Sequence, residues 1–239
     1  MLDLTRFRLL SFDCYGTLIN WEAGIFGALH PILNAHGKAI SDISLLELYS
    51  ELEAEAEQGD FRPYREVLQD VVRGFGERLG FTPSDAETRS LPESLSRWEP
   101  FPDTVAALRQ LKSRHQLAII SNIDDDLFAF AAPKLGVPFD FVITALQARA
   151  YKPSLKIFEM AQERMGVSSA EWLHIGQSIF HDVIPAQSLG LATVWVNRAS
   201  PRAGAGAAKA ASGKPDLEVP DLESLANLAL GERKLKAGG

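Results

Sequence analysis

The sequence predicts an α/β protein with a doubly wound parallel sheet and an all-helical insertion near its N-terminal end. Short apolar runs alternate with helical segments over the second half of the chain, which is typical of parallel strands joined by right-handed crossovers. Residues 19–98 show only helical periodicity, and they separate the first strand from the others. We therefore expect residues 1–18 and 99–239 to form the α/β core, with residues 19–98 inserted as a helical unit.

The first strand is predicted at Leu9–Phe12, and it ends on an acid, Asp13, followed by Gly16 and Thr17. Ligands of open α/β sheets bind outside the carboxyl ends of the strands, so Asp13 is expected to face substrate and is our candidate nucleophile. Cys14 is the only cysteine, which rules out an internal disulfide. Strand alternation predicts that its thiol points away from Asp13 into packing.

The insertion is predicted to contain several helices separated by glycines at 37, 59 and 80. Apolar residues recur at helical spacing in Trp21–Leu33, Leu45–Glu57 and Tyr64–Leu79, and a further helical piece follows Pro83 and ends near Trp98. The chain then rejoins the core near Pro100.

The core resumes with alternating helices and strands. Strands are predicted at Leu117–Ile120, Phe141–Thr144, Trp172–Ile175, Ala192–Val196 and, as a short last strand, Leu217–Val219. Helices are predicted at Asp103–Ser113, Asp124–Leu135, after Ser154 and from Asp221. Asp103 is expected to accept hydrogen bonds from the free amides of its own helix. Ser200–Lys214 is rich in Ala and Gly and is expected to be a surface loop.

Polar residues follow the predicted strands in a chain otherwise built of apolar runs. They are Ser121 and Asn122, then Lys152, then Gln177 with Asp182. An ammonium favours the charged form of a nearby aspartate, so Lys152 is the expected electrostatic partner of Asp13. Ser121, Asn122 and Thr17 can donate hydrogen bonds to substrate oxygens. Asp182 is expected to orient Lys152 or to help activate the water that cleaves an ester on Asp13.

The overall composition and charge limit the classes of partner that the protein can bind. The 239-residue chain is 46% hydrophobic and 23% charged with a formal charge of -7, which argues against a general nucleic-acid surface. No secretory signal or membrane span is visible, so a cytoplasmic protein is expected. The oligomeric state stays open, with a homodimer as one option.

Together these strand-end residues resemble the four motifs of the haloacid dehalogenase-like (HAD) superfamily. Its members have a Rossmann-like core, and in one large branch a helical cap closes over the active site. The opening Asp13-Cys14-Tyr15-Gly16-Thr17-Leu18 is similar to the L-2-haloacid dehalogenase version, which uses no metal or other cofactor. The resemblance implies that Asp13 displaces halide from the 2-carbon of a small carboxylate, with Lys152, Asp182 and Ser121 as further catalytic residues. Water would then cleave the ester and release a 2-hydroxy acid of inverted configuration.

The resemblance disfavours a magnesium-dependent phosphatase, which is a further alternative. Phosphatase members place a second Asp where this chain has Tyr15, and a phenol with a pKa of about 10 is a poor general acid. They also place an acidic magnesium ligand where this chain has Gln177. An idle binding or scaffold protein is less attractive, because Asp13, Lys152 and Asp182 are all retained.

One departure from the dehalogenase pattern and one further resemblance leave the identity of the leaving group open. The helix containing Leu45–Ser50 lacks the arginine that grips halide, and Arg62 or Arg65 would have to substitute. Ser121–Asp124 and Ser178–Asp182 are also similar to a hydrolase that opens the ring of L-azetidine-2-carboxylate, in which the leaving group is an amine. The expected substrate-binding residues are Thr17, Tyr15, Asn122, Trp21, Arg62, Gln177 and His181, and His181 is the one with a side chain that titrates near neutrality.

Overall fold

A computed structural model describes residues 2–198 and 211–231 of the chain, and a six-stranded parallel sheet forms its centre. The strands are β1 (Leu9–Phe12), β2 (Gln116–Ser121), β3 (Phe141–Thr144), β4 (Trp172–Gly176), β5 (Ala192–Val196) and β6 (Leu217–Val219). Their order in the sheet is β3-β2-β1-β4-β5-β6. The chain therefore moves outward from β1 to β3 and returns to β4 on the other side of β1. This places the switch point, where ligands bind in such sheets, between β1 and β4.

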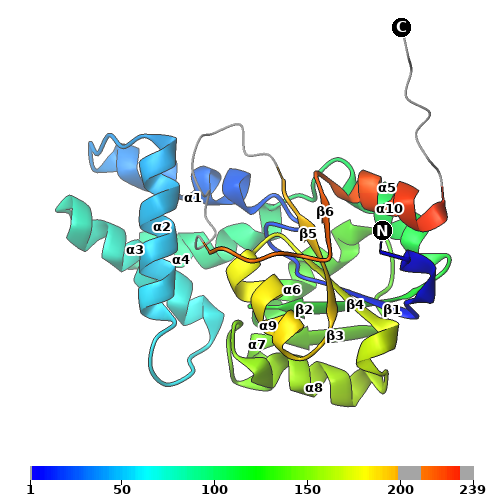
Figure 1. Cartoon of the computed structure of the whole chain (residues 1–239). Helices are drawn as coiled ribbons and strands as arrows, with labels where there is room; N and C mark the ends of the chain where they lie inside the picture. The colour runs from blue at the N-terminus through cyan, green and yellow to red at the C-terminus, as the bar shows by residue number, and fades with distance from the viewer. Residues whose placement is uncertain (1, 199–210, 232–239) are drawn as a thin grey trace, which may run out of the picture.

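Helices cover both faces of the sheet, so both faces are apolar. Leu10 and Phe12 of β1 pack into one hydrophobic cluster, whereas Leu9 packs into a second cluster. This alternation is the two-residue period of a strand buried on each side. Helices α5 (Thr104–Lys112) and α10 (Leu222–Leu230) lie on the first face, and α8 (Leu155–Met165) and α9 (Ile184–Ser188) lie on the second (Figure 1). The doubly wound α/β fold predicted from the sequence is confirmed.

The remaining core segments are short. They are α6 (Asp125–Ala131), α7 (Ala145–Ala148), 3-10 turns at Leu4–Arg6, Ala132–Leu135 and Ser169–Glu171, and a π-helical turn at Ile179–Val183. The prediction for Asp103 was wrong. Its carboxylate makes no bond to α5 and instead pairs with Arg198 and accepts the Leu222 amide at 2.7 Å. Asp103 thus caps α10, which is distant in sequence, rather than its own helix.

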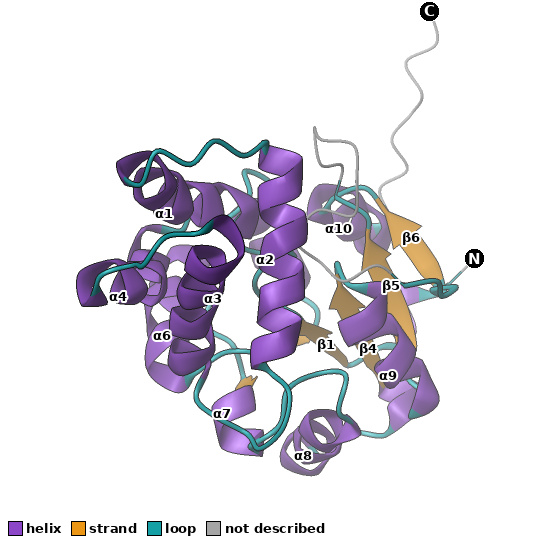
Figure 2. Cartoon of the chain, turned by 90° about the vertical axis from the view of Figure 1, so that its left-hand side faces the viewer, coloured by secondary structure: helices purple, strands orange, loops and turns teal. Residues whose placement is uncertain are grey.

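The inserted cap consists of α1 (Trp21–Ala35), α2 (Asp42–Ala56), α3 (Tyr64–Leu79) and α4 (Asp85–Ser94), followed by a 3-10 turn at Leu95–Arg97. Ser41 caps α2, and Ser84 forms a reciprocal capping box with Glu87 at the start of α4. The cap lies beside the carboxyl ends of the strands, and Figure 2 shows α2 running across the middle with β1 and β4 behind and beside it. The domain boundaries at residues 18 and 99 stay a prediction.

Two other expectations can be compared with the structure. Cys14 is fully buried in the larger hydrophobic cluster, as strand alternation predicts. Most of the predicted loop Ser200–Lys214 lies outside the described residues. Among the described helices, none is both long and apolar enough to cross a membrane.

Candidate active site

The strand-end residues meet in one cavity between the sheet and the cap. Asp13 follows β1, Ser121 ends β2, Lys152 lies in the loop before α8, and Asp182 lies in the π-helical turn after β4. The cavity is lined by Asp13, Tyr15, Trp21, Glu53, Glu57, Tyr64, Ser121, Asn122, Lys152, Gln177, Ser178, His181 and Asp182. Its free space is small, about 50 Å³. The site therefore lies at the sheet edge that the topology favours, with a cap wall opposite.

Lys152 joins the two core carboxylates. Its Nζ lies 2.8 Å from Asp13 Oδ1 and 2.6 Å from Asp182 Oδ1, and it donates a third bond to the carbonyl of Ile120 at 3.0 Å. An ammonium has three donors, so all three are used. The side chain is only 2% exposed, and charges buried to this degree need such partners. Lys152 is therefore locked between the carboxyl ends of β1 and β4.

The two carboxylates differ in their ionisation. Burial raises the pKa of Asp13, and the charge of Asp182 adds to this effect, while Lys152 and Thr17 oppose it. Burial also acts on Asp182, but Lys152 and His174 outweigh it and hold the pKa of Asp182 well below its usual value. The two aspartates raise the pKa of Lys152 against the effect of burial. Asp182 is thus the permanently charged member of the pair.

The turn after β1 holds the second oxygen of Asp13. Thr17 Oγ1 donates to Asp13 Oδ2 at 2.8 Å and accepts the Gln177 amide at 2.9 Å, which ties the β1 turn to the β4 turn. Gly16 has a φ of +94°, and an added Cβ would lie 3.0 Å from the Trp21 ring. Glycine is needed here because the backbone is left-handed and the indole is close.

A buried chain of polar groups fixes Asp182 from behind. His174 Nε2 lies 3.3 Å from Asp182 Oδ1, His174 Nδ1 lies 2.8 Å from Ser11 Oγ, and Trp172 donates to the same hydroxyl at 2.7 Å. Gly176 leaves room for the carboxyl, because an added Cβ would lie 2.4 Å from it. The position of Asp182 is therefore set by the strands β1 and β4 rather than by the loop alone.

Asn122 acts on the backbone of the lysine. Its Oδ1 accepts the Lys152 amide at 2.7 Å and its Nδ2 donates to the Lys152 carbonyl at 3.1 Å. Ser121 lines the cavity beside it and is 1% exposed. The Asn122 side chain thus bridges the end of β2 to the Lys152 loop, and its remaining amide hydrogen is the part left for a ligand.

The cap contributes acids and phenols to the opposite wall. Tyr49 OH donates to Glu53 Oε1 at 3.0 Å, and Tyr64 OH forms a short hydrogen bond to the same oxygen. Burial raises the pKa of Glu53 to about 7. Burial, with the charge of Glu53 adding to it, raises the pKa of Glu57 well above its usual value. Trp21 completes this wall and meets the Tyr49 ring edge to face at 6.3 Å.

The structure brings most of the predicted site residues together. The lining residues that the sequence predicted are Asp13, Tyr15, Trp21, Ser121, Asn122, Lys152, Gln177, His181 and Asp182. Thr17 does not line the cavity but bonds Asp13 directly. Arg62 also does not line it, because its guanidinium pairs with Asp70 at 2.6 Å and bonds the Ala56 carbonyl at 3.0 Å. The roles of these residues stay predictions.

Sequence reasoning missed the acids of the cap wall. Glu53 and Glu57 lie four residues apart and continue a stripe that starts with the fully buried Leu45 and Tyr49. Residues at this spacing share one helix face. Acids that continue a buried stripe are a signal that was visible in the sequence. Tyr64 and Ser178, which also line the cavity, carry no comparable signal.

The donor set does not suit a metal ion. In the described part of the chain, no group of three or more His, Cys, Asp or Glu side chains is placed to hold one. The two carboxylates nearest each other in the core share the Lys152 ammonium, and Gln177 adds only a neutral amide. A divalent cation would have to compete with Lys152 for both aspartates.

Comparison with known proteins agrees with this architecture. The family model described as haloacid dehalogenase-like hydrolase matches residues 7–190. Haloacetate dehalogenase H-2 of Moraxella sp. (strain B) is 27% identical over 94% of this chain and 99% of its own length. An (S)-2-haloacid dehalogenase of Pseudomonas sp. (strain YL) is 25% identical over 92% of this chain and 93% of its own.

Solved structures share the fold at lower identity. An L-2-haloacid dehalogenase from Xanthobacter autotrophicus with covalently bound chloropropionic acid superposes with a TM-score of 0.78 at 23% identity, covering 95% of this chain and 100% of its own. A magnesium-bound HAD-hydrolase from Bacillus subtilis gives a TM-score of 0.77 at 19% identity over 94% of this chain and 99% of its own. The family model spans more than half of the chain, including Asp13, Lys152 and Asp182. This chain is therefore a member of the haloacid dehalogenase-like hydrolase family.

Proposed function

We propose that this protein is a metal-independent hydrolase in which Asp13 displaces a leaving group from a saturated carbon of a small carboxylic acid. Halide on the 2-carbon is the leaving group to test first, because relatives that align over nearly the whole chain are named for haloacids. The observation that carries the proposal is the placement of Asp13 in a small cavity, held by Lys152 and Thr17.

In the first step, a carboxylate oxygen of Asp13 attacks the carbon and the bond to the leaving group breaks with its electron pair. An ester forms on Asp13, so the carboxylate loses its charge. Each Asp13 oxygen has its own donor, Lys152 on Oδ1 and Thr17 on Oδ2. The carbonyl oxygen of the ester therefore keeps a donor, which stabilises the negative charge that develops when water attacks.

In the second step, water cleaves the ester and restores Asp13. Asp182 stays charged because of its low pKa, and the His174 chain fixes its position, so it is suited to orient Lys152 and the water by charge rather than to accept a proton. The substrate carboxylate accepts hydrogen bonds from Ser121 and from the backbone amides of the strand-end loops. All three Lys152 donors are already used, so Lys152 supports the site by charge rather than by a further hydrogen bond.

Halide release from L-2-chloropropionate in the presence of a chelator tests the proposal. The natural protein is expected to release halide, and the isosteric Asp13→Asn variant is expected to lose at least about a thousandfold in rate, as nucleophile removal does elsewhere. Loss of activity on chelation would contradict metal independence. Retained activity in Asp13→Asn would remove Asp13 from the mechanism.

A single turnover in ¹⁸O-water, with enzyme in excess, tests the ester directly. Water attacks the ester carbonyl, so the first product is expected to carry an unlabelled oxygen from Asp13, and the label is expected in the protein. Label in the first product would show direct attack of water on the substrate and would contradict the covalent step.

A further inference from the structure

The nucleophile turn, residues 13–19, is held on its outer side by an arginine from the other half of the chain. Arg198 lies two residues after β5, and its Nε donates to the carbonyl of Thr17 at 2.8 Å. Its Nη1 and Nη2 donate to the two carboxylate oxygens of Asp103 at 3.0 and 3.2 Å. The guanidinium carbon also lies 3.8 Å from the centre of the Phe101 ring. One side chain therefore contacts both the nucleophile turn and the segment through which the chain returns from the cap to the core.

Arginine is the side chain that can make these contacts together. Its planar guanidinium carries five donors in a fixed fork, so two parallel bonds to a carboxylate leave the Nε hydrogen for a third acceptor. The Arg198 and Asp103 side chains are only 11% and 15% exposed, which limits competition from water. A lysine has a single nitrogen, which cannot occupy all three donor positions. The contact of Arg198 with the turn thus depends on the shape of the guanidinium and not only on its charge.

The carbonyl that Arg198 holds and the hydroxyl that bonds the nucleophile belong to the same residue, Thr17. Threonine is branched at Cβ and restricted at χ1, so the position of its hydroxyl follows the position of its backbone. That hydroxyl donates to Asp13 Oδ2 at 2.8 Å and accepts the Gln177 amide at 2.9 Å. Arg198 does not line the cavity, so its effect on Asp13 passes through Thr17.

The next carbonyl of the turn is held by the return segment, residues 98–103, which lies between the last 3-10 turn of the cap and α5. The carbonyl of Leu18 accepts the Phe101 amide at 3.0 Å and the Thr104 hydroxyl at 2.9 Å. Asp103 also accepts the Leu222 amide, and helices α5 and α10 lie side by side (Figure 1). The turn and the return segment are therefore joined at two successive carbonyls of the turn.

We propose that Arg198 is a positioning residue for the nucleophile. Its guanidinium fixes the Thr17 backbone against the return segment, and Thr17 in turn fixes the orientation of the Asp13 carboxylate. This inference rests on the proposed attack by Asp13, and it adds a residue that touches neither the substrate nor Asp13. Loss of the guanidinium fork leaves Asp13 in place but lets its carboxylate turn, which slows attack more than it weakens substrate binding.

Arg198→Lys tests this role, because it keeps the positive charge beside Asp103 and loses the fork. With L-2-chloropropionate, kcat is expected to fall about tenfold, the effect of losing one charge-assisted hydrogen bond, and KM is expected to change by less than about twofold. Arg78→Lys is the matched control, since Arg78 also joins two acceptors, Glu51 and Glu55, on the surface of the cap. It is expected to change neither constant. Full kcat in Arg198→Lys, or an equal loss in the control, would overturn the proposal.

A double-mutant cycle with Thr17→Val tests the path through Thr17. The valine keeps the shape of the side chain but removes the hydroxyl that bonds Asp13. If Arg198 acts through that hydroxyl, adding Arg198→Lys to Thr17→Val is expected to lower kcat by less than about twofold further. Losses in kcat that multiply would contradict the proposal, because Arg198 would then act on another part of the protein.

Hydrogen exchange separates this inference from the proposed function, because it needs no turnover. The Gln177 amide, which donates to Thr17 Oγ1, is expected to exchange about tenfold faster in Arg198→Lys, while the amides of β2 keep their protection. If the natural protein releases no halide, the attack by Asp13 on this substrate is contradicted, and exchange at Gln177 alone decides whether Arg198 positions Thr17. Equal acceleration at Gln177 and in β2, or none at Gln177, would overturn the positioning role.

Discussion

At the scale of single residues, the buried Lys152 and the half-buried Glu53 differ in how well their charged forms are stabilised. Lys152 is held by two carboxylates and a carbonyl, and the two carboxylates raise its pKa, so its charged form is stabilised. Glu53 has only phenol donors and an acidic neighbour, so its charge is costly. Without a ligand, Glu53 should therefore respond to pH near neutrality, while Lys152 and Asp182 should stay charged.

The expected consequence is a pH-dependent stability that depends on Glu53. Folding raises the pKa of Glu53 from 4.5 to about 7, so the folded state binds the proton more tightly than the unfolded state does. This contribution is fully present below pH 4.5 and is lost as the pH rises through 7. Because Glu53 is only half-buried by exposed area, the loss should be on the order of 2 kcal/mol.

Urea unfolding of the natural protein and of Glu53→Gln at pH 5 and pH 8 measures this effect. The variant does not titrate, so its advantage over the natural protein should grow between the two pH values. Tyr49 and Tyr64 stay protonated across this range, since burial raises the pKa of both well above the usual value. The charge of Glu53 also raises the pKa of Glu57, so Glu53→Gln relieves that effect as well, and both changes favour the variant at pH 8. A constant difference between the proteins would show that Glu53 is not perturbed.

At the scale of elements, α1 depends on one glycine. Gly24 lies against the ring of Trp98, and an added Cβ would lie 2.3 Å from a ring atom. Trp98 cannot turn away freely, because its Nε1 donates to Ser94 at 2.9 Å and its ring meets Tyr15 edge to face at 5.8 Å. Tyr15 lines the cavity, so a displacement of Trp98 by a change in α1 would also displace a residue of the site.

Gly24→Ala is therefore expected to lower the free energy of unfolding by about 1–3 kcal/mol and to reduce turnover through Tyr15. Gly27→Ala is the matched control in the same helix, because an added Cβ there meets nothing within 4 Å. It should stabilise the protein by about 0.5–1 kcal/mol, since alanine favours helix. Thermal or urea unfolding measures both. Equal effects of the two substitutions would contradict the contact with Trp98.

The sequence predicted those elements whose signals lie within their own residues. The strands are short apolar runs and the cap helices have their own periodicity, so β1 and α3 can each be predicted from a short stretch of sequence. The acids at strand ends are visible for the same reason. Asp103 was misplaced because its partners, Arg198 and Leu222, lie far along the chain. The direction in which Glu53 and Glu57 face depends on the packing of α2 over the sheet, which periodicity alone does not set.

At the scale of the whole molecule, the cap is attached to the core near the site by a few polar contacts. Helix α3 starts after Pro63, which provides no side-chain cap. The core residue Asp124 takes this place, since its Oδ1 and Oδ2 accept the amides of Tyr64 and Arg65, each at 2.9 Å. Asp124 stands at the start of α6 but makes no capping bond to it.

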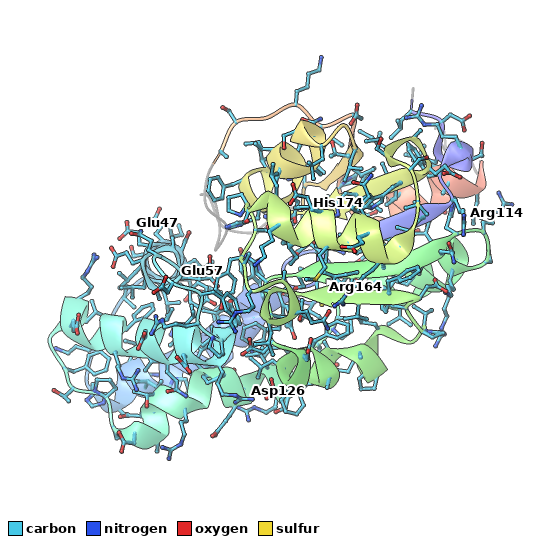
Figure 3. The ribbon with its side chains drawn as sticks, turned by 90° about the horizontal axis from the view of Figure 1, so that it is seen from below. Glu47, Glu57, Arg114, Asp126, Arg164 and His174 are labelled. Atoms are coloured by element: carbon cyan, nitrogen blue, oxygen red, sulfur yellow. The ribbon has the colours of Figure 1, made fainter. Side chains whose placement is uncertain are left out.

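A phenol and an ion pair lie beside this link. Tyr151, which precedes Lys152 in the sequence, donates to the carbonyl of Arg62 at 2.7 Å. Arg65 pairs with Asp126 at 2.6 Å, but the aspartate side chain is 64% exposed. Asp126 is labelled at the lower side of the junction between cap and core (Figure 3). Because Asp124 is buried and Asp126 is not, the two acids should differ in how strongly they hold the cap.

Asp124→Ala is expected to loosen the cap without unfolding the core. Loss of the cap at α3 should cost about 1–2 kcal/mol, and it should open the wall that carries Glu53 and Glu57. Hydrogen exchange should therefore accelerate at the first amides of α3, including Tyr64 and Arg65, while the strand amides of β1 and β4 keep their protection. Because the cap completes the cavity, kcat/KM for a substrate of the natural protein should fall in the same variant.

Asp126→Ala is the control, because an exposed ion pair contributes only about 0–1 kcal/mol. It removes a neighbouring acid of the same junction and should leave exchange at α3 nearly unchanged. If Asp124→Ala accelerated exchange equally in α3 and in the sheet, cap and core would open as one unit. The buried carboxylate would then support the whole fold rather than the closure of the cap over Asp13. Faster exchange in α3 alone would instead show that Asp124, which follows β2, holds the cap closed over the site.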